Sequence, residues 1–579
     1  MNQIPGLDAS FLHLETPQMP MHVGALHNFE LPADYGGNFV ADMRRHMASR
    51  LPFAPALRQK VAVMPLNFTN PSWVDAEPDL DEHIVGITLP AGSGQAELER
   101  QVGVLHAVML DRSRPLWKFH VFDGLANGPD GTRRFAMYTQ LHHAAFDGKA
   151  AVALGQVILD LSPVPRARVA APDGRETEVK LRRQLGLVDT LRGALANQLH
   201  LVATAVKAIP QTIGALSKMA GQKAGDTAGD AVDAVVSRLK GRPARAARHS
   251  VSNLGLAPHT RLNTTLSASR VFASISLPLA QVNAARRRHK ATLNDAVLMV
   301  CSGALRRDFL KHGPLPRKSM VAGVPISTRA KGDTSANTQA TMTVVSLGTH
   351  IADPAKRLRH VLAATAAMKS NMGAMKSLMP TDFPTLGVPW LMEGLGALYA
   401  KAHVAERLPA ISNLTISNVP GPTVPLYMAG ARMLTNYPTS IVVHGVALNI
   451  TVQTYNESLE FGIVACGDAM PEVAELARHV QAAFDEFAAL PATVEAISTE
   501  VPAASVEELV AKKMPTRAAP VRSVSGKKAA GKKAAAKKVA PVRSIRVPAK
   551  AASKRTRSSG TPATPASKVR TPPKKRASR

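Results

Sequence analysis

The chain of 579 residues is long enough for two or three domains and a sizeable core, since 45% of its residues are hydrophobic. Its two cysteines, Cys301 and Cys466, argue against a disulfide framework and a cysteine-rich metal site, and leave open a single disulfide. The net charge of +29 is uneven: of 71 Lys and Arg residues, 22 lie in 512–579 beside no acidic residue, which leaves 49 against 42 acidic residues elsewhere.

Targeting segments are not apparent. The N-terminus has no basic segment followed by an apolar run, so no signal peptide is predicted. No stretch approaches the ~18–20 consecutive apolar residues of a membrane-spanning helix. We therefore expect a cytoplasmic protein without a transmembrane helix, either dissolved or bound peripherally to a membrane.

Residues 1–165 are predicted to form a mixed α/β domain. Short strands are indicated at Val23–Phe29 and Lys118–Phe122, and a helix is indicated near Gln95–Leu110. Trp117 stands between an arginine-containing loop and the second strand. A large aromatic side chain at such a point usually anchors the core, which is the interpretation we favour.

Two adjacent histidines follow the next predicted strand. Alternating side chains predict a strand over Arg134–Leu141, and apolar residues at helical spacing follow Gly148 as far as Leu161. The segment His142-His143-Ala144-Ala145-Phe146-Asp147-Gly148 therefore occupies a strand-to-helix turn. Turns at the edge of a rigid sheet commonly present reactive side chains.

The residue types in this turn suit proton transfer. Histidine titrates near neutral pH, so His142 or His143 can take a proton from an alcohol and return it to a leaving group. Gly148 supplies backbone freedom, and Asp147 is suited to hold the loop or to orient a ring nitrogen. The competing interpretation is a hydrogen-bonded histidine pair at a strand end, which would be the better one for a random His-His sequence.

Residues 166–262 are predicted to form a helical connector. Apolar residues recur at helical spacing from Leu181 to Ile209, and Pro210 is suited to kink or end that helix. Four basic residues share the helix: Arg182, Arg183, Arg192 and Lys207. Packing against the body and contact with a membrane or droplet surface both stay open. A second short helix is indicated over 226–240.

Residues 263–498 are predicted to form a second mixed α/β domain with a closing helix. The strands are indicated at Ser269–Leu277, Met320–Ile326, Leu414–Asn418, Ser440–Val452 and Leu459–Val464, and the closing helix at Pro471–Leu490.

Three polar residues in this second domain are candidates for the site. A helix is predicted over Thr292–Phe309 with Thr292 as its cap. Asn294 and Asp295 fall in its first turn, where a carboxylate interacts favourably with the helix dipole. Asn418 opens the segment Asn418–Pro422, whose composition predicts a rigid turn. We expect Asn418 to hold that turn; a hydrogen bond near a reaction centre is the alternative.

Residues 499–579 form a low-complexity basic tail. They contain no Phe, Tyr, Trp or Leu after Leu509, so they cannot bury a core and are predicted to be disordered. The tail resembles those of linker histones and bacterial histone-like proteins. Its cations predict binding to a polyanion with counterion release. DNA is the leading partner for 512–579, and anionic membrane, polyphosphate and a purely solubilising role are the alternatives.

The histidine turn also carries a family resemblance. HHxxxDG is the active-site motif of acyltransferases related to chloramphenicol acetyltransferase, and the chain is similar to their bacterial wax ester synthase/diacylglycerol acyltransferase (WS/DGAT) branch. The motif alone is moderately specific, because condensation domains of peptide synthetases share it. Further segments carry the resemblance over roughly residues 5–495: Leu7–Leu12, Glu15–Pro17, Pro20–Gly24, Pro71–Asp75, Leu110–Trp117, Leu293–Val297 and Ile416–Pro422.

The resemblance implies a fold and a reaction. It implies two α/β domains of the chloramphenicol acetyltransferase type, with the site in a tunnel between them. It implies transfer of a fatty acyl group from acyl-CoA to diacylglycerol or a long-chain alcohol, with His143 as the general base. His142 and Asp147 would then support the site, and Gly148 would serve the turn.

The resemblance extends to residues outside the turn. Asn294 and Asp295 match an Asn-Asp pair that the family treats as important for activity, which we interpret as support for the site. The resemblance is also compatible with a position of Trp117 in the lining of the substrate tunnel. Because acyl-CoA is a substrate, no cofactor and no metal are expected, and no serine or cysteine nucleophile is implied. Lipid substrates imply peripheral contact with the inner membrane or lipid droplets.

Three other functions stay open from the sequence. A peptide-synthetase condensation domain would share the histidines, but nothing in the chain resembles an adjoining carrier domain. A DNA- or polyanion-binding nucleoid or lipid-droplet protein with a weak or inactive acyltransferase body would explain the tail, and it conflicts with the intact histidine motif. An active acyltransferase tethered to DNA or to an anionic droplet surface combines both features.

Overall fold

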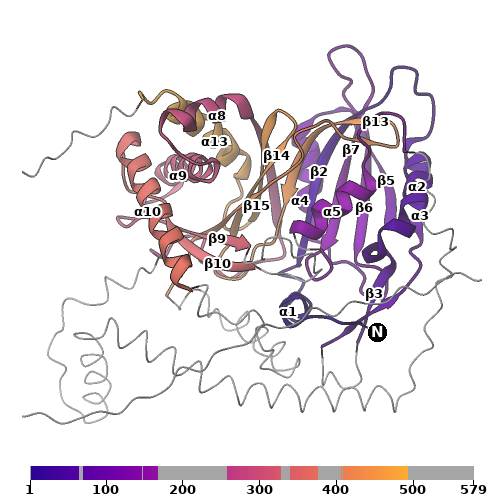
Figure 1. Ribbon diagram of the computed structural model, residues 1–579, viewed down its shortest axis with the longest axis horizontal. Coiled ribbons are helices and arrows are strands. Elements are labelled where there is room, and N and C mark those ends of the chain that lie inside the picture. Colours follow the sequence, from indigo (N-terminus) through magenta and orange to yellow (C-terminus); the bar gives the residue numbers. More distant parts are fainter. Residues whose placement is uncertain are drawn as a thin grey trace, which may run out of the picture. The chain divides into compact units, whose positions relative to one another are not determined.

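The computed structural model describes residues 2–63, 70–146, 148–166, 257–327, 340–375, 406 and 409–492, drawn as coloured ribbon in Figure 1. All of them belong to one compact unit, Met1–Ala496. The connector helices and the basic tail predicted from the sequence lie outside the described residues. No helix in the described part is long and apolar enough to cross a bilayer.

The histidine turn belongs to a six-stranded mixed sheet. Its strand order is β12-β13-β2-β7-β6-β5, and only β5 and β6 run parallel to each other. The strands are β2 (His22–Glu30), β5 (Ile84–Ser93), β6 (Trp117–Leu125), β7 (Arg134–His142), β12 (Tyr427–Met428) and β13 (Ala431–Thr439). The predicted strands at 23–29, 118–122 and 134–141 are confirmed.

The two faces of this sheet are buried against different partners. Phe135, Met137 and Leu141 of β7 pack with α2 (Phe39–Arg50) and α5 (Gly148–Ile158). Ala136 and Tyr138 point to the other face, which packs with α4 (Gln95–His106) and with strands of a second sheet. The predicted alternation along 134–141 is therefore confirmed, and β7 is buried on both sides because it is central.

A second six-stranded sheet has the order β10-β9-β11-β14-β15-β8. Its strands are β8 (Arg270–Pro278), β9 (Val321–Ser327), β10 (Ala340–Ser346), β11 (Leu414–Val419), β14 (Leu448–Tyr455) and β15 (Ser458–Cys466). Its core is shared with α8 (Leu279–Arg288), α9 (Leu293–His312), α10 (Pro354–Met375) and α13 (Val473–Ala488). Two mixed sheets with helices confirm the predicted α/β class.

Smaller elements complete the first half. Helix α1 spans Gly6–Leu14 and α3 spans Leu80–His83. The 3-10 turns η1 (Leu51–Phe53) and η2 (Pro55–Arg58) precede a three-stranded sheet of β1 (Asn2–Gln3), β4 (Ser72–Asp75) and β3 (Gln59–Ala62). Helix α1 packs in a small core with Leu110, Leu116 and Ala144, next to the histidine turn.

The second half of the chain contributes two strands, β12 and β13, to the first sheet. β12 and β13 lie late in the sequence, yet β13 pairs with β2 along its length and so belongs to the first sheet. The chain then returns to the second sheet as β14. The boundaries predicted at 165, 262 and 498 stay predictions, but the division at 263 does not separate the two sheets.

Two sequence predictions were wrong in detail. The run 440–452 is not one strand, because β13 ends at Thr439 and β14 begins at Leu448. Between them the chain makes a turn closed by Val443 and Val446, with Gly445 at a positive φ of 83°. Asn418 does not open a turn: it lies in β11 opposite Val452 of β14.

Strand β13 of the first sheet passes very close to β15 of the second sheet. A Cβ added to Gly462 of β15 would lie 1.6 Å from the carbonyl oxygen of Pro438 in β13. We therefore predict that Gly462→Ala lowers the free energy of unfolding by about 1–3 kcal/mol, because the backbone must move to admit a methyl group. Thermal unfolding measures this. Gly36→Ala is the control, because a Cβ added at Gly36 would meet no other atom within 4 Å. Equal melting temperatures for the two variants would refute the close contact.

Candidate active site

The turn after β7 is fixed by its own backbone and by β2. His142 is the last residue of β7 and pairs with His22 of β2. Its carbonyl accepts hydrogen bonds from the N–H groups of Ala145 and Phe146, at 3.0 and 3.1 Å. Phe146 is 1% exposed and anchors the turn in the core below it. This tight turn explains why a strand passes into α5 within six residues.

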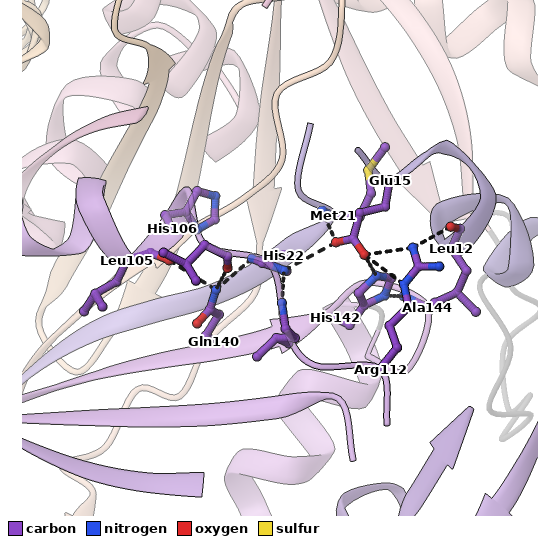
Figure 2. A network of polar contacts seen from close by, with 12 residues as sticks. Leu12, Glu15, Met21, His22, Leu105, His106, Arg112, Gln140, His142 and Ala144 are labelled. Atoms are coloured by element: carbon purple, nitrogen blue, oxygen red, sulfur yellow. Dashed lines mark hydrogen bonds and ion pairs between the residues drawn. The ribbon is translucent and has the colours of Figure 1, made fainter. Parts of the chain in front are cut away.

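His142 is completely buried and points into the protein. Its Nδ1 accepts the N–H of Ala144 at 3.1 Å, so the proton of the neutral ring is on Nε2. That nitrogen lies 3.3 Å from the Glu15 carboxylate (Figure 2). Burial lowers the pKa of His142, and Glu15 opposes this only in part. The ring is therefore neutral at neutral pH.

The Glu15 carboxylate is the centre of a buried polar network (Figure 2). Oε1 accepts the Met21 N–H at 3.0 Å and lies 3.4 Å from Nε2 of His22. Oε2 accepts from the Arg112 guanidinium at 2.9 and 3.2 Å. Burial by itself raises the pKa of Glu15, but the contacts with His142 and His22 and the Met21 N–H hold that pKa far below its usual range. The carboxylate is therefore ionised.

Gln140 extends this network along the sheet. Its side-chain nitrogen donates to the carbonyl of Val108 at 2.7 Å and to Nδ1 of His22 at 2.8 Å. Its side-chain oxygen lies 3.3 Å from Nε2 of His120. The amide thus connects two buried histidines on the face of β7 that also carries His142.

His106 links this face to Ser440, the residue that follows β13. Its Nε2 donates to the carbonyl of Ser440 at 3.1 Å, so its Nδ1 accepts from the Tyr138 hydroxyl at 2.6 Å. Burial lowers the pKa of His106 to about 3, which keeps the ring neutral. Ser440 directly follows β13. The network therefore reaches the segment that carries the chain back to the second sheet.

His143 differs from its neighbour in exposure and contacts. It is half-buried rather than enclosed. Its backbone N–H donates to the carbonyl of Met21 at 2.8 Å. Its ring stacks on that of Phe11 in α1, with centroids 4.1 Å apart and an interplanar angle of 13°. A held but accessible imidazole beside a buried neutral one is suited to exchange protons with a bound molecule.

Comparison with known proteins identifies the family. The family model described as "Wax ester synthase/diacylglycerol acyltransferase catalytic domain" matches residues 4–297, and the one described as "WS/DGAT C-terminal domain" matches residues 337–488. The chain belongs to the WS/DGAT family. The resemblance noted in the sequence is confirmed, and this chain is an acyltransferase.

Individual relatives agree with the WS/DGAT assignment. A Mycobacterium tuberculosis protein whose name places it among the diacylglycerol O-acyltransferases is 34% identical over 483 residues, covering 83% of this chain and 98% of its own. O-acyltransferase WSD of Acinetobacter baylyi is 31% identical over 505 residues, covering 86% and 100%. The solved wax ester synthase/diacylglycerol acyltransferase of Marinobacter aquaeolei VT8 is 25% identical with a TM-score of 0.56, covering 84% and 100%.

The other candidate residues of this WS/DGAT chain lie in different places. Trp117 is 1% exposed in the core; its Nε1 donates to the carbonyl of Leu57 at 2.9 Å and its ring stacks on His83. Asn294 and Asp295 begin α9, where Asp295 and Thr292 form a reciprocal capping box. Gly148 begins α5. Asp147 lies outside the described residues.

The sequence did not single out the polar partners of His142. Glu15, His22 and Arg112 lie in three of the segments that carry the family resemblance, but they are far apart in the chain. Glu15 and Arg112 are separated by 97 positions. No periodicity relates positions at that separation, so the only available signal was a charged residue within each family segment.

Buried neutral histidines predict a pH-dependent stability. Burial lowers the pKa of His27 and of His120 to about 4, against 6.5 for an unburied histidine. Between pH 6.5 and 4 the unfolded chain binds more protons, so the free energy of unfolding rises with pH there. We predict that His120→Gln flattens this slope by up to about 1.4 kcal/mol per pH unit. Denaturant unfolding from pH 4 to 7 measures it, with exposed His259→Gln as control; an unchanged slope would contradict the prediction.

Proposed function

We propose that the chain transfers a fatty acyl group from acyl-CoA to the hydroxyl of diacylglycerol or of a long-chain alcohol, which makes triacylglycerol or a wax ester. His143 is the general base in this proposal. The observation that carries it is the contrast within the histidine pair: His142 is enclosed and fixed on Glu15, whereas His143 is half-buried and held on Phe11. The diacylglycerol O-acyltransferase name of a relative and the wax ester synthase description of the family support the two acceptor classes.

The proposed reaction needs one proton transfer in each direction. A ring nitrogen of His143 removes the acceptor proton while the oxygen attacks the thioester carbonyl. The tetrahedral intermediate then expels the CoA thiolate, which takes the proton from His143. The carbonyl oxygen gains negative charge on the way and requires hydrogen-bond donors aimed at it.

Supporting roles complete the proposal. His142 supports the turn, Gly148 allows the chain to enter α5, and Asp147 holds the loop. Asn294, Asp295 and Asn418 act indirectly, by shaping the second half. An alcohol, a thioester and a base suffice for the chemistry, so we propose that the enzyme uses no cofactor and no metal. Because both substrates are lipids, peripheral contact with the inner membrane or with lipid droplets is part of the proposal.

The test is release of CoA thiol from palmitoyl-CoA in the presence of 1-hexadecanol or dipalmitoylglycerol. We predict acceptor-dependent release by the wild type and a loss of about 10²–10⁴-fold in His143→Ala, as expected for removal of a general base. Exposed His259→Ala is the control and should keep full activity. Equal release by wild type and His143→Ala would mean that the base lies elsewhere; the ratio between acceptors ranks the two products.

The basic tail is a separate proposal. We propose that residues 512–579 attach the enzyme to a polyanion, with DNA as the leading candidate. The proposal rests on the 22 Lys and Arg residues of this segment and on its lack of acidic residues. The comparisons do not support the alternative of a binding protein with an inactive body. We predict that truncation after residue 511 abolishes salt-sensitive DNA binding and leaves acyl transfer intact. Gel-shift assays from 50 to 200 mM salt measure it, and equal binding by both forms would disprove the proposal.

A further inference from the structure

Helix α1 and the residue after it reach both histidines of the pair. Phe11 and Glu15 are four positions apart, so they lie one helical turn from each other on the same side. Phe11 contacts the ring of His143, and Glu15 contacts the ring of His142. The proposed general base and its buried neighbour are therefore both held from the end of α1, which precedes β7 by more than a hundred residues in the sequence.

Glu15 also closes a ring of contacts around the backbone of His143. On one side, Oε1 accepts the N–H of Met21, and the Met21 carbonyl accepts the N–H of His143. On the other side, Oε2 faces Nε2 of His142, and Nδ1 of that ring accepts the N–H of Ala144. Ala144 follows His143 directly. A single carboxylate thus constrains the peptide groups before and after the proposed base.

Phe11 contacts the side chain of His143, in addition to the contacts that hold its backbone. The near-parallel stack, with 4.1 Å between centroids, limits rotation of the His143 ring about its bond to Cβ. An aromatic face also stabilises a cation above it, and His143 becomes an imidazolium when it takes the acceptor proton. The contact therefore favours both the orientation and the charge that the reaction requires.

Arg112 fixes the end of α1 from the opposite direction. One guanidinium nitrogen donates to the carbonyl of Leu12 at 2.6 Å and to Glu15 Oε2 at 2.9 Å. The same residue thus holds the last turn of the helix and compensates the buried negative charge. Figure 2 shows Leu12, Arg112 and Glu15 meeting on one side of His142.

We infer that Glu15 and Phe11 are positioning residues for His143, and that α1 acts as a clamp on the histidine pair. The inference rests on the proposed role of His143 as the base. Neither residue takes or gives the proton that is transferred. Their contribution is to keep the imidazole within reach of the acceptor hydroxyl, where a displacement of about 1 Å costs as much as 10²-fold in rate.

The first test separates positioning from substrate binding. Glu15→Gln keeps the shape of the side chain and removes its charge. We predict that it lowers kcat by about 10–100-fold while KM for palmitoyl-CoA changes less than about twofold. Asp160→Asn is the matched control, because the Asp160 side chain is as buried as that of Glu15 and also forms an ion pair with an arginine, Arg50, at 2.8 Å. That variant should lose stability and keep its kcat below its melting temperature. Equal loss of kcat in both variants would overturn the inference.

The second test uses Phe11 and holds even where Glu15→Gln does not fold. Phe11→Leu keeps an apolar side chain without a ring face and should lower kcat by about threefold to tenfold. Phe11→Tyr restores the ring and should return kcat to within about twofold of the wild type. If the Leu and Tyr variants have the same kcat, the stack plays no part in positioning the base.

A double variant distinguishes failure of the inference from failure of the proposed function. If Glu15 acts through His143, adding Glu15→Gln to His143→Ala should lower the remaining activity no further. Multiplied losses in the double variant would overturn the inference while leaving His143 as the base. Full activity in His143→Ala alone would instead refute the proposed function.

Discussion

The active-site half of this enzyme depends on one buried negative charge. The Glu15 side chain is withdrawn from water, yet it stays ionised because an arginine, two imidazoles and a backbone N–H surround it. An uncompensated buried carboxylate would cost several kcal/mol, and its removal would leave Arg112 without its partner. The contacts that satisfy Glu15 come from three other segments of the chain. Electrostatic satisfaction therefore determines where α1, the start of β2, the loop before β6 and the end of β7 meet.

The alternation of the β-strand separates two roles that the same residue type plays. Successive side chains at a strand end point in different directions. His142, the last residue of β7, shares the face of Gln140 and enters the polar network, whereas His143 begins the turn and reaches the edge of the sheet. Burial makes the first ring a neutral structural group. Partial exposure leaves the second available to a substrate.

Local patterns predicted local structure well. The alternation along 134–141, the cap at Thr292 and the core position of Trp117 each follow from a side chain and its immediate neighbours. The prediction of a single strand over 440–452 was wrong, because periodicity cannot show that a glycine within an apolar run adopts a positive φ. β13 was missed for a different reason. Proline argues against a central strand, but β12 reaches only as far as Arg432, so Pro438 lies beyond the part of β13 that needs partners on both sides.

The site itself was predicted in part. A strand-to-helix turn with two histidines is visible in the sequence, because its residues are contiguous. The network around Glu15 is not, because its members come together only through the tertiary fold, and a charged residue in a polar segment gives no sign that it will be buried. The difference between the two histidines likewise depends on α1, which lies more than a hundred residues before them.

The place of β13 in the first sheet also has a consequence for how the chain folds during synthesis. β2, β5, β6 and β7 are complete once residue 142 has left the ribosome, but the strand that covers β2 begins at residue 431. Domains generally fold in the order in which they are made. Until that late strand arrives, the first sheet ends in an unpaired edge of nine residues, and open edges of this kind pair readily with other chains. The nascent acyltransferase is therefore most prone to aggregation over the interval between these two points, which is the window in which a chaperone would have to protect it.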